Sequence, residues 1–476
     1  MNLTEPLRRV ARERPADPAI VDGARVHTYR DFWSAVGRTA ELLRARGLRA
    51  GDRVLVWLPN GAPFLAAHLG AMAAGILSIP VKAENGPVEL EAAVADGKPR
   101  LLIADRGLLD RLPAGPPPGL DLLAADDLPL DGPPVDVPPE DVPDEHPGSV
   151  IYSYFFGEGR AWGAVLTHGN HLFAATHCAR FHHIEAGDRV LIVLPMLHVF
   201  SMGMGILTSF YRGAAVHVGR SLRPRTILET LSAERITHLP GIPQIVEQLA
   251  RFHDPARYDL GAVKHLTSGA DYLPEPIHRR IQETLGVTLI QGYGLTECFP
   301  TVCNPPDEGN RPGTLGIGGD PRISYRVVDR DGRELAPGEV GEIEIRSPGV
   351  MAGYLDAPET TARVLRGGWL RSGDLGWVDE RGYLHFHRLL KPIINVAGNK
   401  VDPVEVARVL ERCAGVAAAR VSALVTPDDG HLPGVALKAE VDLEPGAAVT
   451  EADVRAHCRR WMAPYKVPQK VELRPA

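Results

Sequence analysis

The segment Gln291–Glu297 reads Gln-Gly-Tyr-Gly-Leu-Thr-Glu and directly follows an apolar stretch. Its glycines would let the backbone approach a ligand closely. The hydroxyl of Thr296 and the carboxylate of Glu297 are groups that can bind a phosphate and a metal ion. The same segment would also serve as an ordinary turn with a helix cap at the end of a strand. Taken alone, it does not decide between these two interpretations.

Further glycine-containing motifs accompany this segment along the chain. In order they are Ser268–Pro274, Gly338–Ile345, Gly353–Tyr354, Gly368–Gly376 and Gly382–Arg388. In this order and at these separations, the set resembles the adenylate-forming superfamily, which contains acyl-CoA synthetases, nonribosomal adenylation domains and luciferases. The resemblance runs from about residue 25 to the C-terminus.

The resemblance implies a site for AMP or an acyl-adenylate. One matched segment packs along the adenine and consists of Gly269, Ala270 and Asp271. A second lies beneath the nucleotide and the acyl carbonyl and consists of Gly292, Tyr293 and Gly294.

Four further positions match residues that contact the AMP moiety or its metal ion. Thr296 matches the residue that hydrogen-bonds the AMP phosphate, and Glu297 matches the Mg²⁺ ligand of the family. Asp374 matches a carboxylate that accepts both ribose hydroxyls, a task that needs an acceptor with several lone pairs. Arg388 resembles an arginine that helps to hold the ribose.

Two positions match the coenzyme A side of the family's site. His198 falls in the stretch that lines the acyl pocket and the pantetheine tunnel, and with Thr296 and Glu297 it is a candidate catalytic residue. Gly398 matches a loop that lies beside the pantetheine arm. Each also has a plainer interpretation, as a buried histidine and a turn glycine. Nearby Phe200, Met202, Gly203 and Met204 suggest an apolar, adaptable acyl pocket.

The segment that should hold the ATP phosphates departs from the family. Members carry a Ser/Thr/Gly-rich loop ending in Gly-x-Pro-Lys-Gly, which binds the β- and γ-phosphates. Here Tyr152–Gly163 occupies that place, with Phe155 and Phe156 at positions of hydroxyl donors. Glu158 would repel a phosphate, and Trp162 replaces the lysine. The segment therefore predicts that a triphosphate is not bound.

The C-terminal end departs as well. Ala463–Leu473 matches the segment that leads to a Pro-Arg-Thr-x-x-Gly-Lys tail, whose lysine orients the carboxylate and the α-phosphate during adenylation. If the chain ends at Ala476, that lysine is absent, whereas a longer chain would supply it. Lys466 and Lys470 lie upstream of the tail and are expected at the surface.

The hinge between the two domains differs too. The segment His387–Asn395 is about one residue longer than the family pattern, so the hinge position falls on Lys391 or Pro392. Proline fixes its own φ angle, so a large rotation should be harder if that bond is the pivot.

The departures affect ATP-side groups, whereas the AMP pocket and the coenzyme A loop remain. This pattern predicts a non-adenylating acyl-CoA ligase, and it resembles such enzymes in bacterial natural-product biosynthesis of the platensimycin and platencin type. The enzyme would take acyl-AMP from a separate adenylating enzyme upstream and transfer the acyl group to coenzyme A. We do not expect this half-reaction to require Mg²⁺.

Two alternatives stay open. The first is a complete ATP-dependent acyl-CoA synthetase with a divergent phosphate loop and a longer natural chain. The second is a non-catalytic protein that binds AMP or an acyl-adenylate. Pyrophosphate release from ATP and acid would favour the first, and saturable binding without coenzyme A consumption would favour the second.

Apolar strands and helices alternate along the chain and position these residues. This alternation predicts an α/β fold. We expect a large N-terminal domain of layered α/β subdomains over residues 1–387, with a β-rich subdomain at about 320–386. Residues 388–476 should form a small, mobile and shortened α+β C-terminal domain.

Composition excludes other classes of function. The 476 residues are 44% hydrophobic and carry a net charge of −7, so no basic excess favours nucleic acid. None of the five cysteines forms a Cys-x-x-Cys pair, which argues against structural zinc. No signal peptide is recognised, and Phe64–Val81 is better interpreted as a buried helix and strand than as a membrane span. We expect a cytoplasmic protein without a membrane or nucleic-acid partner.

Overall fold

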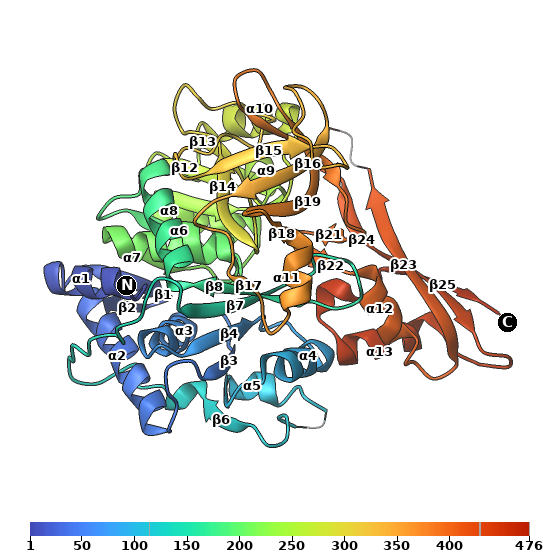
Figure 1. The fold of residues 1–476 in the computed structure, drawn as a ribbon, viewed down its shortest axis with the longest axis horizontal. Helices are drawn as coiled ribbons and strands as arrows, with labels where there is room; N and C mark the ends of the chain where they lie inside the picture. The colour runs from blue at the N-terminus through green and yellow to red at the C-terminus, as the bar shows by residue number, and fades with distance from the viewer. Residues whose placement is uncertain (114, 428–429, 476) are drawn as a thin grey trace.

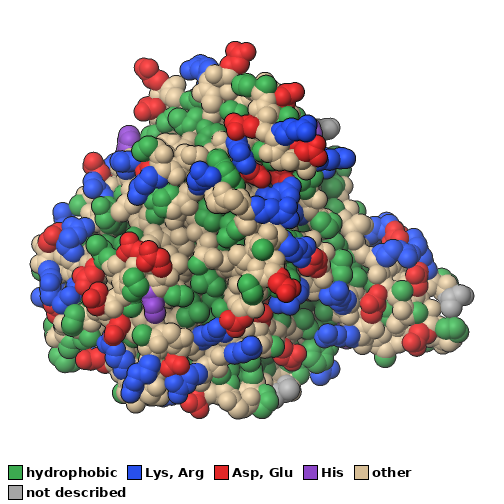
Figure 2. All heavy atoms as spheres, viewed as in Figure 1, with side chains coloured by type: hydrophobic (Ala, Val, Ile, Leu, Met, Phe, Trp, Pro, Cys, Tyr) green, Lys and Arg blue, Asp and Glu red, His purple; other side chains and the backbone are tan. Residues whose placement is uncertain are grey.

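The computed structural model describes residues 1–113, 115–427 and 430–475. The predicted α/β fold is confirmed, with a large N-terminal domain and a smaller C-terminal domain. Figure 1 shows the last strands projecting from one side of the main body, with the C-terminus at their outer end. On the face drawn in Figure 2, acidic and basic side chains are interspersed.

The first sheet has seven strands in the order β17-β8-β7-β4-β3-β5-β6. Its central strands are parallel and apolar on both faces, as expected for a sheet covered by helices on both sides. The strands are β3 (Arg53–Trp57), β4 (Leu77–Val81), β5 (Leu101–Ala104), β6 (Asp121–Ala124), β7 (Pro147–Ser153), β8 (Trp162–Thr167) and β17 (Gly353–Tyr354). The helix and strand predicted within Phe64–Val81 are the end of α3 and β4.

The second sheet has eight strands in the order β14-β13-β12-β11-β9-β10-β1-β2. The strands are β1 (Pro18–Asp22), β2 (Arg25–Thr28), β9 (Arg189–Ile192), β10 (Ala215–Val218), β11 (His238–Gly241), β12 (His265–Ser268), β13 (Thr288–Leu295) and β14 (Cys298–Cys303). Strands β12 and β13 are parallel neighbours, so the motifs that follow their apolar halves meet at one edge of the sheet.

Helices cover both sheets (Figure 1). They are α1 (Glu5–Glu13), α2 (Tyr29–Ala45), α3 (Ala62–Ala73), α4 (Pro87–Gly97), α5 (Arg106–Leu109), α6 (His168–Phe181), α7 (Thr208–Arg212), α8 (Pro224–Ala233), α9 (Pro243–Phe252), α10 (Glu275–Leu285) and α11 (Pro358–Val364). A π-helical segment, Phe200–Leu207, precedes α7. Within the described ranges, no helix has the length and apolar character needed to cross a membrane.

A third, antiparallel sheet carries Asp374, the residue predicted to bind the ribose. It consists of β15 (Ser324–Val328), β16 (Gly341–Arg346), β18 (Leu365–Arg366), β19 (Trp369–Val378) and β20 (Leu384–Leu389). Strand β20 pairs with β19 and runs across the domain boundary predicted at residues 387 and 388. The bounds of the domains stay a prediction.

The smaller domain has its own apolar core. It contains the hairpin β21 (Ile394–Val396) and β22 (Asn399–Val401), the sheet β23 (Val416–Thr426), β24 (Gly434–Leu443) and β25 (Lys470–Arg474), and the helices α12 (Pro403–Leu410) and α13 (Glu451–Trp461). The hairpin faces the larger domain and therefore contributes to the site described below.

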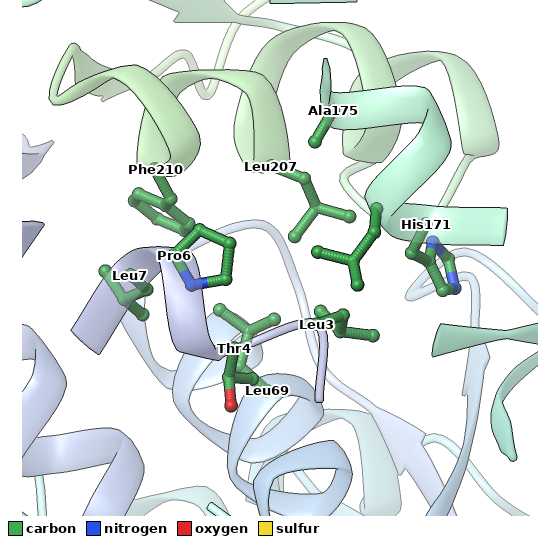
Figure 3. Close-up of a pocket in the computed structure, with 10 residues that line it drawn as sticks. Leu3, Thr4, Pro6, Leu7, Leu69, His171, Ala175, Leu207 and Phe210 are labelled. Carbon is green, nitrogen blue, oxygen red and sulfur yellow. The ribbon is translucent and has the colours of Figure 1, made fainter. Parts of the chain in front are cut away.

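The N-terminal segment closes a narrow gap between the two layers. Figure 3 shows Leu3 and Pro6 facing Leu69 of α3 on one side and Leu207 and Phe210 on the other. The gap has a volume of about 10 Å³, which is room for one water molecule at most. It is a packing feature rather than a ligand site.

Candidate functional site

A cavity of about 500 Å³ lies beside β12, β13 and β19. Every site residue predicted from the sequence lines it: His198, Gly269, Ala270, Asp271, Gly292, Tyr293, Gly294, Thr296, Glu297, Asp374, Arg388 and Gly398. Residues from the second and third sheets and the C-terminal hairpin therefore converge on one volume. The individual roles assigned to them stay predictions.

Asp374 presents a carboxylate to this cavity. The residue is 2% exposed, and its Oδ2 accepts a 2.6 Å hydrogen bond from the Tyr293 hydroxyl. Lys391 Nζ lies 3.6 Å from Oδ1, and Oδ1 has no hydrogen-bond partner in the described part of the chain. Burial and the Asp374 charge raise the pKa of Tyr293 well above its usual value, so the phenol stays a donor. Lone pairs remain on the carboxylate for hydroxyl donors.

Glu297 is buried and is bound by a tyrosine. Its Oε1 accepts a 3.0 Å hydrogen bond from the Tyr354 hydroxyl, and burial together with Glu297 raises the pKa of Tyr354. The described residues contain no group of three His, Cys, Asp or Glu side chains that could hold a metal ion. Glu297 could therefore contribute to a Mg²⁺ site only with a nucleotide that brings the other ligands.

The C-terminal hairpin β21-β22 docks on Ala270, within the segment predicted to pack along the adenine. The carbonyl oxygen of Ala270 accepts hydrogen bonds from Asn395 Nδ2 at 3.3 Å and Lys400 Nζ at 3.4 Å. Gly398 has a φ of 80°, and a Cβ there would lie 3.2 Å from Ile242 Cγ2. Both the left-handed conformation and the close approach favour glycine. The hairpin thus covers the cavity from the side of the smaller domain.

The segment Tyr152–Gly163 forms an aromatic cluster instead of a polar cradle. The ring of Phe156 lies 5.1 Å from Phe155, 6.1 Å from Trp162 and 6.0 Å from Tyr354, measured between centroids. Phe155 is buried. Such ring pairs favour edge-to-face and tilted contacts, as observed here. The side chains predicted to obstruct a triphosphate therefore pack together around Tyr354, the same residue that binds Glu297.

The backbone of this segment is engaged by C-terminal residues. The amide N–H of Gly159 donates a 2.6 Å hydrogen bond to Asp402 Oδ2, and its carbonyl accepts one of 3.1 Å from Arg408 Nη1. A Cβ at Gly157 would lie 2.6 Å from Pro392 Cγ. An amide of the kind that binds phosphate in glycine-rich loops thus binds a carboxylate of the chain itself.

Lys466 corrects a prediction, because it is not a surface residue. It is 1% exposed, and its Nζ lies 2.9 Å from Glu89 Oε1 and 2.6 Å from Glu405 Oε2. It also donates to the Tyr154 hydroxyl at 2.8 Å. The sequence position alone did not show that α4 and α12 bring two carboxylates together there. Lys470 is exposed, as expected.

A second cavity, of about 720 Å³, adjoins the first. The residues that line both are Ser153, Tyr154, His198, Thr296 and Lys400. The second cavity has a charged lining of both signs, made of the cations Lys82, Arg160, Arg408 and Arg412 and the carboxylates Glu89, Glu91, Asp96 and Glu405. Because the two cavities share lining residues, a ligand in the second can extend into the first.

His198 lies at the junction, close to two lysines. Burial, followed by the charges of Lys82 and Lys400, lowers the pKa of His198 to about 3. Burial lowers the pKa of Lys82 to about 8, and its Nζ donates a 2.7 Å hydrogen bond to Asn399 Oδ1. At neutral pH the imidazole is therefore uncharged and a weak base, whereas the lysines are the local cations.

Sequence reasoning missed several of these contributors. Lys82, Lys400 and Tyr354 were given no function, and Lys391 was considered only as a hinge residue, although each contacts a predicted site residue or lines a cavity. One available signal was the rarity of lysine, since the chain has only eight lysines among its 52 basic residues. Their placement depends on contacts between the two domains, which no local motif encodes.

Comparison with known proteins agrees with this geometry. The AMP-binding enzyme family matches residues 7–355. A feruloyl-CoA synthase from Amycolatopsis sp is 33% identical over 98% of this chain and 94% of its own length. The structure of an amide bond synthetase from Marinactinospora thermotolerans superposes with a TM-score of 0.86 at 25% identity, covering 100% of this chain and 96% of that one.

The chain belongs to the AMP-binding enzyme family. A double mutant of the o-succinylbenzoate CoA synthetase from Bacillus subtilis, bound with a product analogue, shares the fold, with a TM-score of 0.86 at 23% identity over 98% of this chain and 94% of that one. The predicted membership of the adenylate-forming superfamily is thereby confirmed. The closer resemblance to platensimycin-type ligases stays a prediction.

Proposed function

We propose that this protein is an acyl-CoA ligase that performs only the second half-reaction of its family, acyl-AMP + CoA → acyl-CoA + AMP. The relatives include a feruloyl-CoA synthase and a sulfoacetate–CoA ligase, which favours a coenzyme A thioester as the product. The acyl-adenylate would come from a separate adenylating enzyme upstream.

The observation that carries the proposal is the state of Tyr152–Gly163. Its aromatic side chains pack against one another, and its Gly159 amide is bound to Asp402. Glu158 forms a 2.7 Å ion pair with Arg363, so this cation is already paired with a carboxylate. Binding a triphosphate would require breaking these contacts and desolvating Glu158 beside phosphate oxygens, which is unfavourable.

The nucleotide side, in contrast, keeps the groups that acyl-AMP needs. Asp374 Oδ1 and Gln291 Oε1 have no hydrogen-bond partner among the residues that the structure describes, and both residues line the cavity. Lys391, close to Asp374, adds a positive charge near the nucleotide. Unpaired buried acceptors cost free energy unless a ligand supplies donors.

The chemistry of transfer needs mainly orientation. The coenzyme A sulfur attacks the acyl carbonyl carbon, the new C–S bond forms, and the bond from carbon to the phosphate oxygen breaks. AMP leaves with that electron pair, and the thiol proton passes to solvent. We propose that Lys82 and Lys400 stabilise the thiolate and that neutral His198 positions it, because a nearby cation favours the ionised thiol.

A complete ATP-dependent acyl-CoA synthetase is the competing function. The names of the relatives favour it, since they describe synthases and ligases. It predicts acid-dependent exchange of labelled pyrophosphate into ATP, a reaction that requires the phosphate-binding segment and Mg²⁺ but no coenzyme A.

The test uses this difference. With a panel of free acids that includes ferulic and octanoic acid, we expect no exchange above the enzyme-free control. With the corresponding acyl-AMPs and coenzyme A, we expect acyl-CoA formation that is unchanged by EDTA. Exchange with any acid, or a strict Mg²⁺ requirement for transfer, would overturn the proposal.

A further inference from the structure

Two buried histidines line the cavity in a region that neither the nucleotide nor coenzyme A accounts for. His177 lies on α6 and His182 follows the end of that helix, and each is 4% exposed. Both line the 500 Å³ cavity together with Cys178, Val302 and Cys303. Helix α6 comes from the larger domain and contributes none of the predicted nucleotide-binding residues.

Both histidines lack hydrogen bonds that their imidazoles require. Nδ1 of His177 and Nδ1 of His182 are buried without a hydrogen-bond partner in the described ranges of the chain. Two polar neighbours make weak contacts with these rings: Asp320 Oδ2 lies 4.0 Å from His177 Nδ1, and Cys303 Sγ lies 3.9 Å from His182 Nε2. Buried nitrogens without partners require an explanation, and a polar group of a ligand in the adjoining cavity supplies one.

The residues around the two histidines determine which charge the bound group of the ligand can carry. Burial lowers the pKa of His177 to about 4 against the opposing charge of Asp320, and burial together with neighbouring histidines lowers the pKa of His182 to about 3, so both rings are neutral at pH 7. The same Oδ2 of Asp320 that lies near His177 is paired with Arg180 and Arg322, whose side chains are more than half exposed. A carboxylate or sulfonate at this end would meet neutral rings and a buried carboxylate that already pairs with both arginines, so an anion is disfavoured.

A metal ion does not explain the histidines, because no three metal-binding side chains come together among the described residues. The cations that line the cavity, Arg388, Lys391 and Lys400, come from β20 and the smaller domain, at the nucleotide end. Because neither a metal ion nor the nucleotide accounts for the two histidines, the acyl group is the remaining part of the ligand that they can contact.

Other residues that line the same cavity are apolar. Phe200 and Phe299 line the cavity with their rings 6.2 Å apart at 63°, and Met204 lies on the same π-helical segment as Phe200. A Cβ at Gly203 or Gly294 would come within 3.0 Å of the Phe299 ring, so this ring is closely held. Rigid aromatic walls suit a flat apolar body.

We infer that the acyl group is apolar with an uncharged oxygen, a hydroxyl or a carbonyl, at the end remote from its reacting carboxyl carbon, and that His177 and His182 bind this oxygen. Each neutral imidazole can act as a donor through one nitrogen and an acceptor through the other, so the pair can serve either oxygen function. The inference rests on the proposed function only in that the cavity holds an acyl-adenylate.

The test measures binding without turnover. Stable 5′-O-(N-acylsulfamoyl)adenosines that carry cinnamoyl, 4-hydroxycinnamoyl, 4-formylcinnamoyl and 4-carboxycinnamoyl groups are titrated calorimetrically into the protein. We expect the hydroxyl or formyl compound to bind at least about 10-fold more tightly than the cinnamoyl compound, and the carboxylate to bind most weakly. Equal binding of the neutral compounds, no binding of any, or tightest binding of the carboxylate would overturn the inference.

Variants locate the effect. In His177→Phe and His182→Phe we expect the preference for the oxygen-bearing compound to fall to within about 3-fold, with cinnamoyl binding retained as evidence of folding. His253→Phe, which changes a histidine outside the cavity, should keep the full preference. A preference unchanged in both cavity variants would contradict the assignment. Because no ATP or coenzyme A is present, failure of the proposed half-reaction would leave this result unchanged.

Discussion

Two regions that meet around the same cavity are built in opposite ways. One is the nucleotide wall, formed by β12, β13 and β19, and the other is the segment Tyr152–Gly163. On the wall, Ser268 Oγ, Gln291 Oε1 and Asp374 Oδ1 are buried without hydrogen-bond partners in the described part of the protein. In the segment, the aromatic rings pack together and the amide of Gly159 is already bound.

The wall has polar groups that are free for a ligand, whereas the groups of the segment are used in packing. Unpaired buried polar groups are unfavourable in the free protein, so they indicate a surface prepared for a polar ligand. Among the buried side-chain nitrogens and oxygens of the segment, only the indole nitrogen of Trp162 lacks a partner. We propose that a surface of that kind stabilises the contact between the domains rather than binding a phosphate.

The largest effect is expected at Asp374. Asp374→Ala removes a buried carboxylate and leaves Tyr293 and Lys391 without their partner. Transfer from acyl-AMP should fall by about 30- to 1000-fold, equivalent to about 2–4 kcal/mol, with a raised KM. Steady-state rates with acyl-AMP measure this. Asp374→Asn should lose less, and an unchanged rate in the alanine variant would remove the nucleotide wall from the account.

The next effect is expected at Lys466. Lys466→Met leaves Glu89 and Glu405 buried without a cation, which should weaken the docking of the smaller domain. We expect transfer to fall by about 10- to 100-fold and the Tm to drop, as measured by kinetics and calorimetry. The matched control is Lys470→Met, which changes an exposed lysine nearby on the chain. Similar losses in both variants would contradict a specific role for the buried cluster.

A smaller effect is expected at His198. With its pKa lowered to about 3, the imidazole is already neutral throughout pH 6–8 and gains no proton until the pH falls far below 6. Replacing it by an uncharged side chain therefore removes no titration from this range. His198→Gln should lower transfer by less than about 10-fold and leave the shape of the pH–rate profile unchanged. Loss of an acidic limb near pH 6.5 would show instead that His198 acts as a base.

The smallest effects are expected in the aromatic segment. Transfer involves no β- or γ-phosphate, so Trp162→Ala should change its rate by less than about 3-fold if the protein stays folded. Glu158→Gln breaks only the partly exposed ion pair with Arg363 and should act similarly. A loss at Trp162 comparable to that at Asp374, with an unchanged Tm, would mean that the segment takes part in the reaction.

Local motifs predicted much of the site, and contacts between distant segments account for the rest. Asp374 and Glu297 were identified because each lies within a short motif that resembles one of the family's motifs. The hydrogen bonds from Tyr293 and Tyr354 were not, because they join residues 81 and 57 positions apart. Lys466 was wrongly predicted to be exposed for the same reason. The carboxylates that it contacts come from α4 and α12, and neither helix carries a motif that predicts the pairing.

The fold was easier to predict than the contacts within it. Apolar strands such as Arg53–Trp57 and Leu101–Ala104 can be recognised from their composition, since buried parallel strands are apolar on both faces. His177 and His182 show what could not be predicted from the sequence. Their sequence neighbourhood is that of an ordinary helix, and only the cavity beside them makes their unpaired nitrogens meaningful.

The most direct test of the central claim compares two routes to the same product in one enzyme preparation. One reaction contains acyl-AMP and coenzyme A, and the other contains the matching free acid, ATP, Mg²⁺ and coenzyme A, over the same acyl panel. The account predicts acyl-CoA formation at least about 100-fold faster from acyl-AMP, because the ATP-side contacts that would stabilise phosphoryl charge are replaced by an aromatic cluster. Comparable rates by the two routes would contradict it.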